Sequence, residues 1–250
     1  MSDHVRVEHG DGVLAITLAR PERRNAITTA MYGALADAIE SVADDPALRL
    51  VTFAGEGQDF AAGNDLADFI DPDREGEIPV WRFLRALVRC ELPLLAAVQG
   101  NCVGIGTTLL LHCDLVIADE SARFSMPFVD LGLVPEAASS LLLPRLAGRR
   151  RAARYLLIGE RFGVDEALEI GLVSHKALPG RLNDQLAELT AALLAKPAEA
   201  LRETQRLLRH GDREGILERM QVEGEVFSER LKSAEAQAAI GAFFAGRNRP

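Results

Sequence analysis

The chain has 250 residues, of which 48% are hydrophobic and 26% charged, and its formal net charge is −9. This length can bury one large core, so we expect a soluble globular protein. The acidic balance disfavours general nucleic-acid binding, which needs a basic face. No apolar run approaches the roughly 18 residues of a membrane span, so we expect no membrane partner.

The N-terminus and the cysteines indicate the compartment. The first residues lack the basic start and apolar run of a secretory signal, and we therefore expect a cytoplasmic protein. The cysteines Cys90, Cys102 and Cys113 lie among apolar neighbours without the spacing of metal ligands. We expect buried thiols, no disulfide framework and no metal site.

The first half of the chain alternates between strands and helices. Period-two alternation at 5–9 and 13–18, around Gly10-Asp11-Gly12, predicts a β-hairpin. Asn25 is expected to cap a helix that runs through Val42. A further helix is expected at 80–90, and apolar strands are expected at 48–54, 94–98 and 114–118. This order predicts a largely parallel sheet that is covered on both faces.

The second half is mostly helical. The charged stretch 71–79 contains a glycine and prolines and is typical of a loop, either a substrate lid or a slack connection. After residue 165 a strand signal remains at 172–175, and helical periodicity covers 180–195, 197–209, 212–231 and 233–244. We expect a core over 1–195 and a C-terminal helical region over 196–250, whose surplus apolar residues favour self-association.

Two turns rich in small residues, at 60–66 and 100–106, each follow a buried strand and open a helix. Together they can aim two backbone N–H groups at one oxygen, which is how proteins hold an enolate or oxyanion without a side chain. A third segment, at 131–140, carries Glu136 directly after a proline. Glu136 is the candidate base.

Several motifs occur in an order that resembles the crotonase superfamily, also called enoyl-CoA hydratase/isomerase. The resemblance covers residues 12 to about 178 and rests on Ala19-Arg20-Pro21, Asn25-Ala26-Ile27, Ala62-Gly63-Asn64-Asp65-Leu66, Ala97-Val98-Gln99-Gly100, Gly104-Ile105-Gly106 and Cys113-Asp114. It implies an α/β fold, a spiral of repeated ββα units with a C-terminal helical region. It also implies homo-trimers or hexamers and acyl-CoA thioester substrates, with CoA as part of the substrate and no separate cofactor.

The resemblance also implies roles for individual residues. The oxyanion-hole N–H groups are those of Asn64 and Ile105, and Gly104 permits the tight backbone path between them. The backbone of Ala62 is similar to the one that meets the adenine of CoA, and Arg24 suits the CoA phosphates. The same comparison places further residues at the substrate, namely Asp65, Leu66, Phe128 and Asp130, although Asp65 is also a good helix cap.

The reaction depends on the acids and bases, which vary within the superfamily. Hydratases resemble one another in two glutamates, and this chain has Thr108 and Phe128 in their places. Moving a double bond from position 3 to position 2 of an acyl-CoA needs a single base. The segment 127–140 resembles peroxisomal-type Δ3,Δ2-enoyl-CoA isomerases, which implies that Glu136 is the proton shuttle in fatty acid or related acyl-CoA metabolism.

Alternatives stay open at this point. The chain can be an enoyl-CoA hydratase of broad or modest activity in which Glu136 orients water, or a non-catalytic acyl-CoA-binding protein. Apolar neighbours would raise the pKa of Glu136, whereas a helix N-terminus would lower it, so the sign of the shift is open. His112, in an apolar helix, is expected to be a core histidine.

Overall fold

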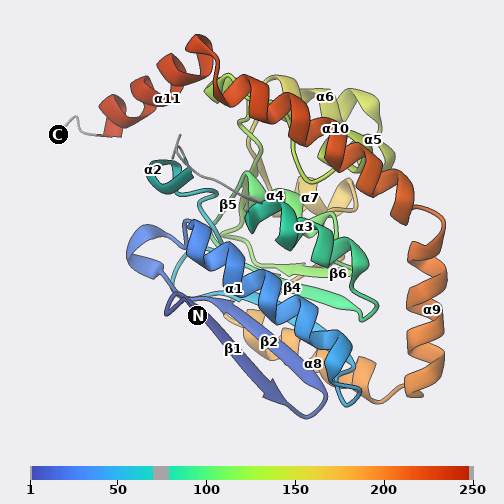
Figure 1. Ribbon diagram of the computed structural model, residues 1–250. Helices are drawn as coiled ribbons and strands as arrows, with labels where there is room; N and C mark the ends of the chain where they lie inside the picture. Colours follow the sequence, from blue (N-terminus) through green and yellow to red (C-terminus); the bar gives the residue numbers. More distant parts are fainter. Residues whose placement is uncertain (1, 70–78, 248–250) are drawn as a thin grey trace.

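A six-stranded sheet lies at the centre of the structure, a computed structural model that describes residues 2–69 and 79–247 (Figure 1). β1 and β2 form an antiparallel hairpin, and every later neighbour in the sheet pairs in parallel. The predicted hairpin and the largely parallel sheet are confirmed. In spatial order the strands are β1 (Val5–Gly10), β2 (Val13–Leu18), β3 (Leu50–Gly55), β4 (Leu94–Val98), β6 (Leu115–Ala118) and β9 (His175–Lys176).

A second, smaller sheet carries the two glycine-containing turns. It consists of β5 (Asn101–Val103), β7 (Arg123–Ser125) and β8 (Phe162–Gly163). Ala61 forms a parallel bridge with Cys102, and Ile27 forms one with Asn64. These bridges place the turn that follows Ala61 beside the turn that follows β5.

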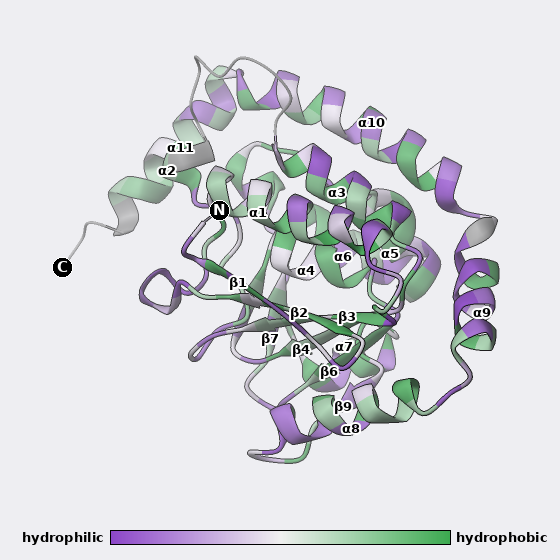
Figure 2. Cartoon of the chain, turned by 60° about the horizontal axis from the view of Figure 1, so that its bottom comes forward, coloured by the Kyte–Doolittle hydropathy of each residue, from purple (hydrophilic) through white to green (hydrophobic). Residues whose placement is uncertain are grey.

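Helices cover both faces of the large sheet. Successive side chains of a strand point to opposite faces, so each face presents apolar side chains that a helix can cover. Ala96 and Val116 belong to the main core, whereas Ala97 and Ile117 pack against Leu182 and other residues of α8 (Leu182–Leu194). On the main-core face, α1 (Thr29–Glu40) packs against α3 (Pro79–Arg89). Figure 2 shows the apolar residues gathered between these layers.

The chain ends in the expected series of helices. α9 (Ala198–His210) leads to the long α10 (Arg213–Leu231), which crosses α3 and is followed by α11 (Ala234–Arg247) (Figure 1). Gly224 of α10 allows close approach of the Trp81 ring of α3. The other helices are α2 (Leu66–Phe69), α4 (Ile105–Leu110), α5 (Ser139–Ala147), α6 (Arg149–Leu157) and α7 (Val164–Glu169). Within the described ranges, none of the helices is long and apolar enough to cross a membrane.

Some sequence predictions were wrong in detail. Asn25 does not cap α1. It has a φ of 54°, and its side chain donates to the carbonyls of Glu56 and Asp59 at 2.9 and 2.7 Å. The cap is Thr28, whose hydroxyl accepts from the Met31 N–H at 3.2 Å. The last strand begins at His175 instead of Leu172. The expected loop at 71–79 falls almost entirely at 70–78, outside the described residues.

Candidate active site

The two glycine-containing turns touch each other. A Cβ atom on Gly63, whose φ is 91°, would lie 3.1 Å from the carbonyl oxygen of Val103. A Cβ on Gly104, whose φ is 56°, would lie 4.0 Å from the Cα of Gly63. Both positions therefore need glycine for its positive φ, and Gly63 needs it also for the close contact. The next residue in each turn is Asn64 or Ile105.

The backbone N–H groups of Asn64 and Ile105 are available to a ligand. In the described part of the chain, neither of them donates a hydrogen bond to a backbone acceptor. Their neighbours are engaged, because the Asp65 N–H donates to Ile27 at 2.9 Å and the Gly104 N–H donates to Ser125 at 2.8 Å. Two N–H donors on touching turns can bind one carbonyl oxygen and stabilise it as negative charge develops.

Glu136 contacts α4, the helix that begins at Ile105. The Thr108 hydroxyl of α4 donates to Glu136 Oε1 at 2.5 Å, and Thr108 lies one turn after Ile105. The side chain of Glu136 is buried, with 4% of the residue exposed. Burial raises its pKa to about 8, the negative charge of Glu223 adds to the rise, and the Thr108 hydrogen bond opposes it. The pKa shift of Glu136, whose direction the sequence leaves open, is therefore upward.

Glu136 also stands apart from the N-terminus of the helix that follows. α5 begins at Ser139, with Ala138 as its capping residue, so Glu136 precedes the helix and is not part of its first turn. Ala137 and Ala138 have φ values of 59° and 56°, in the left-handed region. This region costs a residue other than glycine roughly 1 to 2 kcal/mol. Surrounding contacts must hold this segment in place.

Tyr32 binds the first of the two turns and is close enough to Glu136 for the charge of that residue to affect it. Its hydroxyl, on α1, donates a hydrogen bond to Oδ1 of Asn64, and the residue is 1% exposed. Burial and the nearby charge of Glu136 raise the pKa of Tyr32. The Asn64 side chain is thereby turned toward the protein interior, which leaves its backbone N–H as the group offered to a ligand.

The predicted CoA-binding residues lie around the first turn. The Ala62 N–H donates to the Arg24 carbonyl at 2.9 Å, so these two residues are neighbours. The Arg24 side chain is 70% exposed and reaches Asp59 at 3.9 Å. Asp65 forms an ion pair with Arg20 at 2.7 Å and accepts from the Ala67 N–H at 3.3 Å, as a cap of the helix that starts at Leu66.

The other two predicted substrate residues follow β7. Phe128 is buried, with 6% exposed. Asp130 is exposed on a 3-10 turn, and its carboxylate lies against Gly159. Within the described residues, no hydrogen bond connects Asp130 to Glu136, whereas Thr108 of α4 donates to Glu136.

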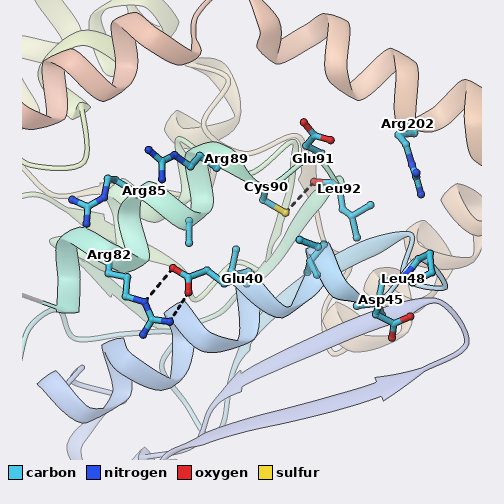
Figure 3. Close-up of a pocket in the computed structure, with 15 residues that line it drawn as sticks. Glu40, Asp45, Leu48, Arg82, Arg85, Arg89, Cys90, Glu91, Leu92 and Arg202 are labelled. Carbon is cyan, nitrogen blue, oxygen red and sulfur yellow. Dashed lines mark hydrogen bonds and ion pairs between the residues drawn. The ribbon is translucent and has the colours of Figure 1, made fainter.

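A separate groove of about 670 Å³ lies between α1, α3 and α9. It is lined by apolar residues and by charges of both signs, and Arg82 in it donates to Glu40 (Figure 3). The candidate residues from the sequence do not line this groove. Its cations and carboxylates largely balance each other, so it offers little net charge to an ionic ligand.

Metal and thiol chemistry find no support in the described residues. Within 2–69 and 79–247, no group of three or more His, Cys, Asp or Glu side chains is placed to hold a metal ion. The three cysteines are free thiols, and burial raises the pKa of each. The expectation of buried thiols is confirmed for Cys90 and Cys102, whereas Cys113 is only partly buried.

Sequence reasoning missed three residues around Glu136. In the sequence Thr108 stands out only because a glutamate is missing at its position, whereas in the structure its hydroxyl donates to Glu136. Tyr32 and Glu223 were not considered, and Glu223 accepts from the N–H groups of Ala138 and Ser140 at 2.6 and 2.9 Å. A signal for Glu223 was present, since it interrupts the apolar stripe of Met220 and Phe227 on α10. His112 is the buried core histidine that was expected.

Comparisons with known proteins identify the family of this chain. The family described as enoyl-CoA hydratase/isomerase matches residues 8–249. The 1,2-epoxyphenylacetyl-CoA isomerase of Escherichia coli (strain K12) is 33% identical, covering 95% of this chain and 94% of that protein. The 2,3-dehydroadipyl-CoA hydratase of the same organism is 31% identical, covering 94% and 93%.

A solved structure is similar over almost its whole length. The enoyl-CoA hydratase/isomerase from Pseudoalteromonas atlantica T6c superposes with a TM-score of 0.94 at 40% identity and covers 98% of both chains. The mixed α/β fold expected from the sequence is that of the crotonase superfamily. This chain belongs to the enoyl-CoA hydratase/isomerase family of that superfamily, whose members act on acyl-CoA thioesters.

Proposed function

We propose that this enzyme shifts the double bond of a 3-enoyl-CoA to position 2, with Glu136 as the proton shuttle. The observation that carries the proposal is the combination of one buried, basic carboxylate with two N–H donors that no backbone acceptor of the described residues engages. Glu136 has a pKa raised to about 8, and Thr108 and Phe128 occupy the places of the hydratase glutamates. A base with this pKa accepts a carbon-bound proton more readily than an ordinary carboxylate.

The reaction balances with this single group. Glu136 removes a proton from C2, and the electron pair moves into the thioester to give a dienolate whose oxygen is held by the N–H groups of Asn64 and Ile105. The protonated Glu136 then returns the proton to C4, which leaves the double bond between C2 and C3. No water and no second acid are consumed.

The neighbouring carboxylate, Glu223, is not suited to a second acid–base role. Each of its two oxygens accepts a backbone N–H, at 2.6 Å from Ala138 and at 2.9 Å from Ser140. Hydration needs one group to activate water and a source of a proton for the α-carbon. With Glu223 engaged, Glu136 is left alone, which favours isomerisation over hydration.

A direct comparison of two reactions tests this proposal. Purified enzyme is incubated with a 3-enoyl-CoA and, separately, with a 2-enoyl-CoA, and the initial rates of isomerisation and hydration are measured. We expect isomerisation to be the faster reaction. Hydration that is faster than isomerisation would favour the second candidate, an enoyl-CoA hydratase. The similarity to a 2,3-dehydroadipyl-CoA hydratase supports this candidate. Acyl-CoA binding without either reaction would indicate a non-catalytic binder.

A further inference from the structure

The strained segment that carries Glu136 is held at both ends by a single distant helix. Arg230 Nε of α10 donates to the carbonyl of Gly132 at 3.0 Å. Two turns earlier on α10, Glu223 accepts from the N–H groups of Ala138 and Ser140. Glu136 lies between these two attachment points. The segment therefore has its ends bound to α10 and its centre bound to Thr108 of α4.

Burial of the Glu223 carboxylate costs free energy, because a charged group loses its hydration in the protein interior. Glu223 is 6% exposed, on the same face of α10 as Met220 and Phe227, where an apolar residue would pack well. A buried carboxylate is retained at such a position when its hydrogen bonds are satisfied. Its two acceptor oxygens match two N–H groups that would otherwise be left without an acceptor at the start of α5.

The left-handed residues explain why the segment needs this support. Ala137 and Ala138 follow Glu136 directly with φ values of 59° and 56°. His112 Nε2 bonds to the Ala137 carbonyl at 2.9 Å, and burial lowers the pKa of His112 to about 4, so the neutral ring donates this bond. The Ala138 N–H is bound by Glu223. The backbone of Ala137 and that of Ala138 are thus each hydrogen-bonded to a buried side chain.

We propose that Glu223 is a positioning residue, which holds the Glu136 segment in its left-handed conformation and so aims the base at the substrate. The proposal rests on the proposed role of Glu136 as base. It assigns to α10, a helix of the C-terminal helical region, a part in the proposed active site, in addition to the self-association expected from the apolar residues of that region.

The charge of Glu223 also acts on Glu136. Thr108 from α4 faces Glu136 and lowers its pKa, whereas Glu223 from α10 raises it, and Tyr32 from α1 feels the charge of Glu136. Burial raises the pKa of Glu223, and its hydrogen bonds to Ser140 and Ala138 and the charge of Arg219, one turn earlier on α10, oppose this rise. His112 is neutral above pH about 4. Removing the charge at Glu223 therefore lowers the pKa of Glu136.

Glu223→Gln tests the proposal, with Glu229→Gln as the matched control, because Glu229 is an exposed glutamate of the same helix. An amide offers one acceptor oxygen and points an N–H₂ group at the second backbone donor, so one hydrogen bond is lost. For Glu223→Gln we expect kcat for isomerisation to fall at least tenfold with KM changed less than about threefold. The acidic limb of the pH profile should move to lower pH. Glu229→Gln should leave all three quantities as in the wild type.

Ala138→Gly provides a rescue test. Glycine adopts positive φ without the Cβ penalty, so the segment depends less on Glu223. In the Glu223→Gln, Ala138→Gly double variant we expect at least a threefold recovery of kcat over Glu223→Gln alone. A structural defect elsewhere in the fold would not be repaired by this change, and a double variant no better than Glu223→Gln contradicts the proposal.

Amide hydrogen exchange separates this inference from the proposed function. In Glu223→Gln the amides of residues 133–142 should exchange at least tenfold faster than in Glu229→Gln, while those of β3 and β4 stay unchanged. Unchanged exchange at 133–142 overturns the positioning role whatever the enzyme catalyses. Faster exchange there in a protein whose wild type does not isomerise 3-enoyl-CoA would leave the positioning role standing and reject the proposed reaction.

Discussion

At the scale of single residues, the proposed chemistry depends on the environment of Glu136. A carboxylate that is buried among apolar residues and next to a second buried carboxylate resists ionisation, and one hydroxyl partly offsets this. The balance makes Glu136 a stronger base than an exposed glutamate. The environment also predicts how activity and stability respond to pH.

Thr108→Val should shift the pH dependence of activity. The variant keeps the shape of the side chain and removes the hydroxyl that donates to Glu136 at 2.5 Å. The pKa of Glu136 should rise by roughly one to two units, because a hydrogen bond to a charged group contributes about 1.5 to 3 kcal/mol. The acidic limb of kcat/KM against pH should move upward, whereas Thr108→Ser should keep the wild-type profile. An unmoved limb in Thr108→Val would show that Glu136 does not govern it.

Burial of Glu136 should also make the fold less stable as the pH rises. Its pKa is about 8 in the folded state and about 4.5 in the unfolded chain, so the folded state binds more protons between these values. The free energy of unfolding of the wild type, relative to Glu136→Gln, should fall across this window by at most about 1.4 kcal/mol per pH unit. Below and above the window the difference should be constant. Urea unfolding of both proteins at a series of pH values measures it, and a flat difference would contradict the burial argument.

At the scale of elements, α4 is placed by a close contact with the first turn. A Cβ on Gly106 would lie 3.0 Å from the Cβ of Ala61 and 3.1 Å from its carbonyl oxygen. Ala61 is held by its bridge to Cys102 and cannot move away easily. The position of the Ile105 N–H therefore depends on the absence of a side chain at the next residue.

Gly106→Ala should accordingly destabilise the fold and lower kcat. We expect a loss of roughly 1 to 3 kcal/mol in the free energy of unfolding, as for other overpacked sites. Gly33→Ala is the matched control, because Gly33 lies in α1 and an added Cβ would meet no described atom within 4 Å apart from the adjacent backbone of its own helix. Gly33→Ala should increase the free energy of unfolding by roughly 0.5 to 1 kcal/mol. Chemical unfolding and kinetics measure both, and equal stability changes in the two variants would contradict the packing argument.

Local sequence patterns predicted the elements better than the site. The strands and helices follow from apolar periodicity, and the two glycine turns follow from their small residues after buried strands. Asn25 was misassigned because its partners, Glu56 and Asp59, lie about thirty residues away. Glu223 lies 85 residues from Ala138, so its role was invisible without the fold. Side chains whose partners are distant in sequence set the environment of Glu136, and local patterns do not report them.

At the scale of the whole molecule, the C-terminal helices bury part of the apolar surface that suggested self-association. Met220, Phe227 and Ile240 pack into the chain's own core, whereas Val226 and Phe243 are 41% and 43% exposed. Leu207 and Leu208 of α9 are exposed at 68% and 70%. These exposed side chains on α9, α10 and α11 are the apolar groups that self-association would bury.

We therefore expect the protein to form homo-trimers or larger assemblies in solution. Light scattering coupled to size exclusion, at micromolar concentration, measures the mass directly. A mass of three chains or a multiple of three agrees with this expectation. A monodisperse species at the 27.1 kDa of a single chain would contradict it.

The central claim is that Glu136 is the base, and Glu136→Gln tests it most directly. The variant keeps the size of the side chain and can still accept from Thr108, but it cannot take up a proton at neutral pH. We expect kcat for 3-enoyl-CoA isomerisation to fall by at least about 10²-fold, while the affinity for a saturated acyl-CoA, measured by calorimetry, stays close to that of the wild type. Wild-type turnover in Glu136→Gln would contradict the account.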